Sequence, residues 1–99
     1  MKFWVSFRTE ALEDVESVLG YFSNYNDLAQ RFNLEFERCI EQLRDFPESH
    51  QKIYFDVRRT LLLKFSIAVY YVVHLESELI EVIAVIDARR DPRLWQQRI

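Results

Sequence analysis

The hydrophobic periodicity changes along the chain, and this change constrains the fold more than any other feature. In the first half, apolar residues recur every three or four positions, as they do on one face of an amphipathic helix. From Ile53 onward they recur at every second position, and β-branched and aromatic residues become frequent, which is typical of strands. Helices and strands therefore occupy separate parts of the sequence, which indicates an α+β fold.

The N-terminal segment predicts a short strand followed by a helix. Phe3, Val5 and Phe7 alternate with their neighbours at the period of a half-buried strand. Thr9 is a suitable N-cap, and apolar residues at helical spacing then predict a helix over about 10–23.

A second helix is expected between a turn and a proline. The sequence NYND supplies turn residues, and Asp27 with Gln30 resembles a capping box. The helix is expected to stop at Phe46-Pro47, because the residue before a proline is pushed out of the helical region. Two successive amphipathic helices indicate a helical hairpin.

The second half predicts a mostly antiparallel sheet of three to four strands, packed with one face on the hairpin. Ile53 to Ser66 alternates at period two, and SIAVYYVVHL and LIEVIAVID are joined by the short connection ESE. Asp91 and Pro92 then provide an N-cap and a first helical residue for a short C-terminal helical turn. The whole chain, 1–99, is expected to form one domain.

Composition excludes several classes of protein. A hydrophobic fraction of 49% with a single Gly and two Pro is that of a folded globular chain. The N-terminus meets Arg8 and Glu10 before a signal-peptide core could form, and the apolar stretch LLLKFSIAVYYVVHL is broken by Lys64 and Ser66. We expect no membrane span and a cytoplasmic location.

No metal or cofactor is expected. The sequence has no glycine-rich phosphate loop and no paired-cysteine motif. Cys39 lies on the apolar stripe of the second helix, where a core position is the usual interpretation, and His50 and His74 occupy unrelated positions.

The cations are concentrated in the C-terminal half. Residues 1–56 carry a net charge of −5 and residues 57–99 a net charge of +2. In a continuous strand register, Arg58 and Lys64 would lie on the sheet face opposite the helices. Together with the arginines at 89, 90 and 93 and Trp95, they would form a phosphate-binding surface with a stacking platform.

A structural interpretation of the same residues remains open. Arg58 or Arg59 could pair with Asp56, Arg90 could pair with Asp91, and Trp95 could cap the end of the core.

Two segments resemble the RelE/ParE superfamily of toxins from type II toxin-antitoxin modules, in particular its ParE-like branch. They are PESHQKIYFDVRRTLLLKFSIAVYYVV and IEVIAVIDARRDPRLWQQR. The residues that fit the family pattern are Pro47, Arg58 or Arg59, Phe65, Tyr70, Tyr71, Arg90, Asp91, Pro92, Trp95 and Arg98. Two departures are Asp87, where many relatives have histidine, and Ser66-Ile67, where many have Pro-Tyr.

The resemblance implies a growth-inhibiting toxin that a cognate antitoxin neutralises. Within it, we favour a ParE-like mode, which poisons DNA gyrase by binding and serves plasmid stabilisation, because the sequence shows no evident acid/base set. The residues expected to bind the target or nucleic acid are Arg58, Arg59, Lys64, Arg89, Arg90, Arg93, Trp95 and Arg98.

Two alternatives carry different residue roles. In a RelE-like ribosome-dependent mRNA endoribonuclease, Arg58, Lys64 and Arg90 would stabilise the phosphorane charge and Trp95 would stack a base. In a non-toxic module, the chain would keep antitoxin binding alone and act in repression of its own operon.

Overall fold

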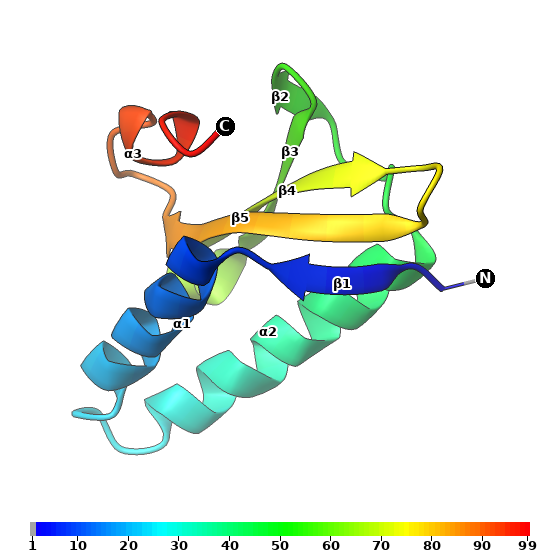
Figure 1. Ribbon diagram of the computed structural model, residues 1–99. Coiled ribbons are helices and arrows are strands. Elements are labelled where there is room, and N and C mark those ends of the chain that lie inside the picture. Colours follow the sequence, from blue (N-terminus) through cyan, green and yellow to red (C-terminus); the bar gives the residue numbers. More distant parts are fainter. Residues whose placement is uncertain (1) are drawn as a thin grey trace.

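The computed structural model describes residues 2–99, and in it a five-stranded sheet packs against a helical hairpin (Figure 1). The elements in chain order are β1 (Trp4–Phe7), α1 (Thr9–Phe22), α2 (Leu28–Asp45), β2 (Lys52–Tyr54), β3 (Val57–Leu62), the 3₁₀ helix η1 (Leu63–Phe65), β4 (Ile67–His74), β5 (Leu79–Asp87) and α3 (Arg93–Gln96). The expected α+β fold with a short C-terminal helix is confirmed.

The strand order is β1-β5-β4-β3-β2. β1 pairs with β5 in parallel, and the other neighbouring strands are antiparallel. A parallel neighbour needs a long crossover, which the helical hairpin between β1 and the later strands provides. The two central strands β4 and β5 are buried along most of their length.

The helices lie close to the expected positions, but their N-terminal caps differ. α1 begins at Thr9 itself, with Arg8 as the flanking residue. Asp27 precedes α2 and makes no side-chain hydrogen bond to its first turn, so the expected capping box is wrong. The backbone of Asp27, at φ −94° and ψ 13°, lacks the extended conformation that directs a capping side chain toward the helix.

The alternation from Ile53 to Ser66 is interrupted twice, and the expected continuous register is therefore wrong. Phe55 adopts a positive φ of 50° in the turn that separates β2 from β3. β3 then ends at Leu62, and Ser66 follows η1 in the left-handed region with φ 55°. Each interruption resets which face of the sheet the following side chains occupy.

The core lies on both faces of the sheet. On the helical side, one cluster joins Phe32 and Phe36 of α2 to Val69, Val82 and Val85, and a second joins Leu43, Tyr71 and Ile80. On the opposite face, α3 covers a third cluster with Val57, Tyr70, Ile83 and Trp95. The C-terminal segment is thus part of the folded core.

No helix among residues 2–99 is long and apolar enough to cross a membrane.

Candidate functional site

The arginine near the start of β3 lies on the helical side of the sheet, opposite to the expected face. Arg58 pairs across the ladder with Tyr71, which belongs to the helix-side core. Its Nη1 donates hydrogen bonds to the carbonyl oxygens of His50 (2.5 Å) and Glu48 (3.4 Å), and its Nη2 lies 3.5 Å from the Glu48 carboxylate. The side chain is 12% exposed, so Arg58 fastens the loop that follows α2.

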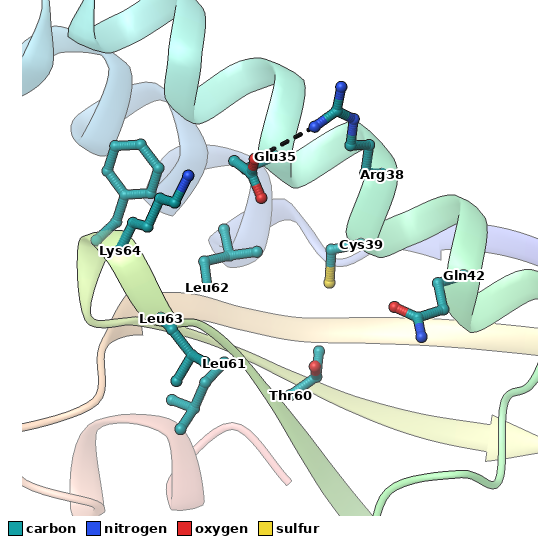
Figure 2. A pocket seen from close by; sticks show the side chains of 10 residues that line it. Glu35, Arg38, Cys39, Gln42, Thr60, Leu61, Leu62, Leu63 and Lys64 are labelled. Atoms are coloured by element: carbon teal, nitrogen blue, oxygen red, sulfur yellow. Dashed lines mark hydrogen bonds and ion pairs between the residues drawn. The ribbon is translucent and has the colours of Figure 1, made fainter.

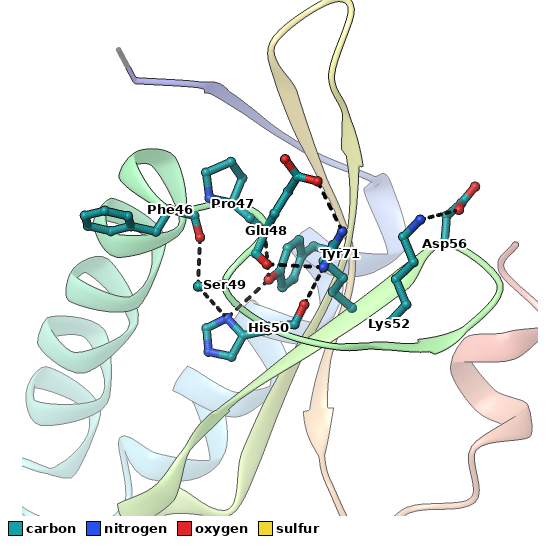
Figure 3. Close-up of polar contacts among 9 residues, drawn as sticks. Phe46, Pro47, Glu48, Ser49, His50, Lys52, Asp56 and Tyr71 are labelled. Carbon is teal, nitrogen blue, oxygen red and sulfur yellow. Dashed lines mark hydrogen bonds and ion pairs between the residues drawn. The ribbon is translucent and has the colours of Figure 1, made fainter.

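A tyrosine at the centre of the sheet completes this anchor (Figure 3). The Tyr71 hydroxyl donates to the carbonyl oxygen of Pro47 at 3.2 Å and lies 3.3 Å from Nδ1 of His50, which also contacts Ser49 Oγ at 3.2 Å. Burial raises the pKa of Tyr71 to about 12. The hydroxyl therefore keeps its proton at neutral pH and holds the loop.

A Tyr71→Phe variant tests this environment by alkaline titration. Tyr71 is expected to ionise near pH 12, and the near-ultraviolet absorbance change should lose this step in the variant. Because the pKa is raised from 10, the stabilisation from the buried phenol is present below pH 10 and is lost as the pH rises toward 12. An unchanged absorbance step near pH 12 in the variant would contradict the assignment.

Lys64 is exposed in η1, beside a groove between α2 and β3 (Figure 2). The groove has a volume of about 300 Å³, with Cys39 and Thr60 on its floor and the Glu35–Arg38 ion pair at its rim. Burial raises the pKa of the Cys39 thiol to about 11, so the thiolate that a nucleophile needs is scarce at neutral pH. The core position expected for Cys39 agrees with its contacts to the apolar clusters.

The C-terminal arginines mostly engage carboxylates of this chain. Arg89 forms a two-pronged pair with Asp87, at 2.7 and 3.0 Å, and Arg93 reaches Asp91 at 2.6 Å. Both pairs are largely exposed and therefore weak, which leaves these cations free to exchange partners. The hydrogen bonds from Arg89 lower the pKa of Asp87 to about 2, so this carboxylate holds no proton to donate at neutral pH.

Arg98 has a structural position instead. Its guanidinium donates to Asp14 at 2.6 and 3.2 Å and to the carbonyl oxygen of Ile83 at 3.1 Å. Both partners of the ion pair are mostly buried, at 19% and 13% side-chain exposure.

Trp95 is buried, and this corrects its expected role as an open stacking platform. Its ring stacks on Tyr70, with centroids 4.5 Å apart, and meets Tyr54 edge-on at 5.5 Å. Only 4% of the residue is exposed. The structural interpretation, in which Trp95 caps the core, is confirmed. The ion pairs suggested in the same interpretation are not formed. Asp56 pairs with Lys52 and not with Arg58 or Arg59, and Asp91 pairs with Arg93 and not with Arg90.

Among residues 2–99, three of the expected target-binding cations make no ion pair: Arg59, Lys64 and Arg90. Arg59 lies half-buried on the face covered by α3, opposite Tyr70. Arg90 is exposed at the rim of a groove of about 570 Å³ between α1 and the end of β5.

The three proposed nuclease cations do not converge on one point. Arg58 lies near the start of β3 and Lys64 lies beyond its end, which puts roughly 13 Å of strand between them at ~3.3 Å per residue. Arg90 is at the same end of the sheet as Lys64, because the Ala88 amide bonds to the carbonyl oxygen of Ser66 at 2.9 Å. Within the described chain, no group of three or more His, Cys, Asp or Glu side chains is placed to hold a metal ion.

The fold resembles that of solved bacterial toxins. Two solved structures that the chain resembles are an arginine-to-alanine double mutant of the E. coli toxin RelE in the free state and the isolated E. coli RelE toxin in a P2₁ crystal form. The TM-scores are 0.73 and 0.67, each at 16% identity. The alignments cover 100% of this chain and 99% of the first structure, and 96% and 94% for the second. The chain therefore has the fold of these two structures.

The family follows from the sequence comparison. A family model described as the ParE toxin of the type II toxin-antitoxin system parDE matches residues 5–92. The chain belongs to this family, and so to the RelE/ParE superfamily of toxins. The type of the family implies an antitoxin partner. A search of curated proteins found no match.

Two residues of the site were missed by reasoning from the sequence. The sequence pattern presents His50 solely as a possible metal ligand and Tyr71 solely as part of a family motif, yet both hold the loop after α2. A signal was present, since a tyrosine inside a very apolar strand needs a partner for its hydroxyl.

Proposed function

We propose that this toxin inhibits growth by binding and poisoning DNA gyrase, and that its cognate antitoxin neutralises it. The observation that carries the proposal is the match of the ParE model over residues 5–92.

The chemistry of the site supports binding over RNA cleavage. Attack by a 2′-hydroxyl needs a base and an acid placed on either side of one phosphate. Asp87 is ionised and bound to Arg89, the Tyr71 hydroxyl is buried and bound to Pro47, and Arg58 is bound to the loop after α2. These groups are occupied by the fold, and Arg58 lies at the opposite end of β3 from Lys64 and Arg90.

The basic end of the sheet is the surface we assign to the target. Lys64 and Arg90 are exposed there without ion pairs within the described residues, and Arg89 and Arg93 stand beside them in weak exposed pairs. We exclude Arg58, Trp95 and Arg98 from this surface because each has a structural role. Arg59 is half-buried on the α3 side and is not needed for it.

Purified toxin should inhibit the supercoiling activity of DNA gyrase. A Lys64→Ala/Arg90→Ala double variant should require about tenfold more protein for the same inhibition, equivalent to ~1.4 kcal/mol of binding. Lys52→Ala removes an exposed cation from β2, on the far edge of the sheet, and is expected to inhibit like the wild-type chain.

Labelling of growing bacteria separates the three functions. Early loss of thymidine incorporation after induction, with methionine incorporation intact, is the expected result. Early loss of methionine incorporation would contradict the proposal and favour ribosome-dependent RNA cleavage. Normal growth with abundant folded toxin would favour a module that keeps antitoxin binding alone.

A further inference from the structure

Two leucines are exposed at the basic end of the sheet. Leu63, in η1, is 81% exposed, more than any other large apolar side chain that the structure describes, and Leu61, near the end of β3, is 41% exposed. Leu61 lies on the face of the sheet that carries α3, because side chains alternate along a strand and Val57 of the same strand packs beneath α3. Figure 2 shows both leucines on the side of β3 away from α2. We call these two residues the leucine patch.

The turn that presents Leu63 is fixed at both of its ends. Leu62 is buried, and Phe65 packs against the same core cluster on the helical side. The Ser66 amide donates to the carbonyl oxygen of Leu63 at 3.4 Å, and the Ser66 carbonyl oxygen accepts from the Ala88 amide at 2.9 Å. Since its neighbours are held by the core, Leu63 cannot turn inward, and a partner that covers it has little backbone freedom to remove.

The charge around the leucine patch is positive. Residues 57–66 carry three cations and no carboxylate. Two of these cations, Arg59 and Lys64, make no ion pair within residues 2–99. Arg59 precedes Leu61 by two residues on the same face of the strand, and Lys64 follows Leu63 directly. The complementary surface therefore carries carboxylates around an apolar centre.

The apolar character of the patch favours a protein partner over nucleic acid. Nucleic acids are bound through phosphate contacts from cations and through stacking on aromatic rings. A leucine side chain provides neither contact, and the ring expected to stack a base, that of Trp95, is buried. Leucines gain free energy when the apolar side chains of a protein cover them, while cations at the rim attract carboxylates.

We infer that the leucine patch is the apolar centre of the target-binding surface and takes an acidic segment of the target protein. The segment places apolar side chains on Leu61 and Leu63 and carboxylates opposite Arg59 and Lys64. Lys64 already belongs to the surface assigned to gyrase, so the patch continues that surface. The inference rests on the proposed function and deepens it, because the toxin then holds the gyrase protein itself and needs no DNA to bind.

The test measures the affinity of the full chain for purified gyrase in the absence of DNA. Wild-type toxin is expected to bind, and Leu63→Ser should weaken binding by at least about tenfold. Leu63→Met keeps an apolar side chain of similar volume and should bind like the wild type. Leu75→Ser is the matched control: Leu75 is 56% exposed directly after β4, at the opposite end of the sheet, and its loss should leave binding unchanged.

The dependence on salt separates the two kinds of contact. Lys64→Glu should weaken binding to gyrase most at low salt, and its difference from the wild type should shrink as the salt concentration rises, because salt screens exposed charges. The loss in Leu63→Ser should persist at high salt, since burial of apolar surface is not screened.

Wild-type affinity of Leu63→Ser for gyrase would overturn the inference, as would binding that requires DNA. Dissociation of a wild-type dimer by Leu63→Ser, at unchanged affinity for gyrase, would assign the patch to a second copy of the chain and overturn it as well. A wild-type chain without effect on gyrase would instead reject the proposed function, and growth inhibition in bacteria then decides on the patch. Toxicity lost in Leu63→Ser but kept in Leu75→Ser would support a different protein target of the same chemistry, whereas toxicity kept in both would overturn the inference.

Discussion

A Phe32→Ala variant is expected to lose about 4 kcal/mol of its free energy of unfolding. Phe32 is fully buried at the centre of an aromatic cluster between the helices and the sheet. Its ring lies 5.5 Å from that of Phe65 and 5.8 Å from those of Phe22 and Phe36. Truncation removes these contacts and leaves a cavity bounded by three different elements, which cannot close around it easily.

The loss should be visible in urea denaturation as a lower midpoint with an unchanged slope. Phe46→Ala is the control, because Phe46 is 63% exposed after the end of α2 and its loss should change stability by less than about 0.5 kcal/mol. A change below roughly 1 kcal/mol for Phe32→Ala would show that the cluster repacks. Since Phe65 belongs to η1, the variant should also loosen the turn that carries Lys64.

The helices and strands that could be predicted from periodicity are those whose apolar residues are buried in the core. Apolar residues at helical spacing located both helices, and Pro47 correctly placed the end of α2 at the preceding residues. The central strands were evident because both of their faces are covered, so nearly every residue is apolar. These features follow from local sequence alone.

The register of β3 could not be predicted in the same way. The turn before it depends on Phe55, a residue type that rarely adopts a positive φ, and the turn after it depends on Ser66. Neither position carries the glycine that marks such turns. Arg58 therefore faces the helices, although the alternation of apolar residues predicts the opposite side.

The ion-pair partners of the arginines could not be predicted from the local sequence either. Arg89 and Arg93 each bind an aspartate two positions earlier, and the position of that carboxylate depends on a tight turn. Arg98 binds Asp14 across 84 positions of sequence, which requires the docked α3 and α1 to be known together. Burial of Trp95 likewise depends on where α3 packs. The sequence around Trp95 is therefore compatible with an exposed platform or with a core position.

The Asp14–Arg98 ion pair is the second feature expected to have a large effect on stability. Asp14 Oδ2 accepts hydrogen bonds from both Arg98 (2.6 Å) and the backbone amide of Val85 (3.0 Å). The pair thereby joins α1, β5 and the C-terminal segment. Asp14→Ala should lower the free energy of unfolding by about 3 kcal/mol, because it leaves a mostly buried guanidinium and a backbone amide without their acceptor.

Asp14→Asn separates the two contributions. The amide oxygen can still accept from the Val85 amide, so this variant should lose less stability than Asp14→Ala. The difference between the two variants measures the hydrogen bond, and the loss that remains in Asp14→Asn measures the charge. Lys52→Ala breaks an exposed ion pair and should cost less than about 1 kcal/mol. In Asp14→Ala, release of the C-terminal segment should shift the fluorescence of Trp95 to the red, because its ring would leave the stack with Tyr70 and meet water. Unchanged emission together with wild-type stability would mean that the apolar contacts of α3 hold this segment without the ion pair, and that Arg98 is free to serve the target-binding surface.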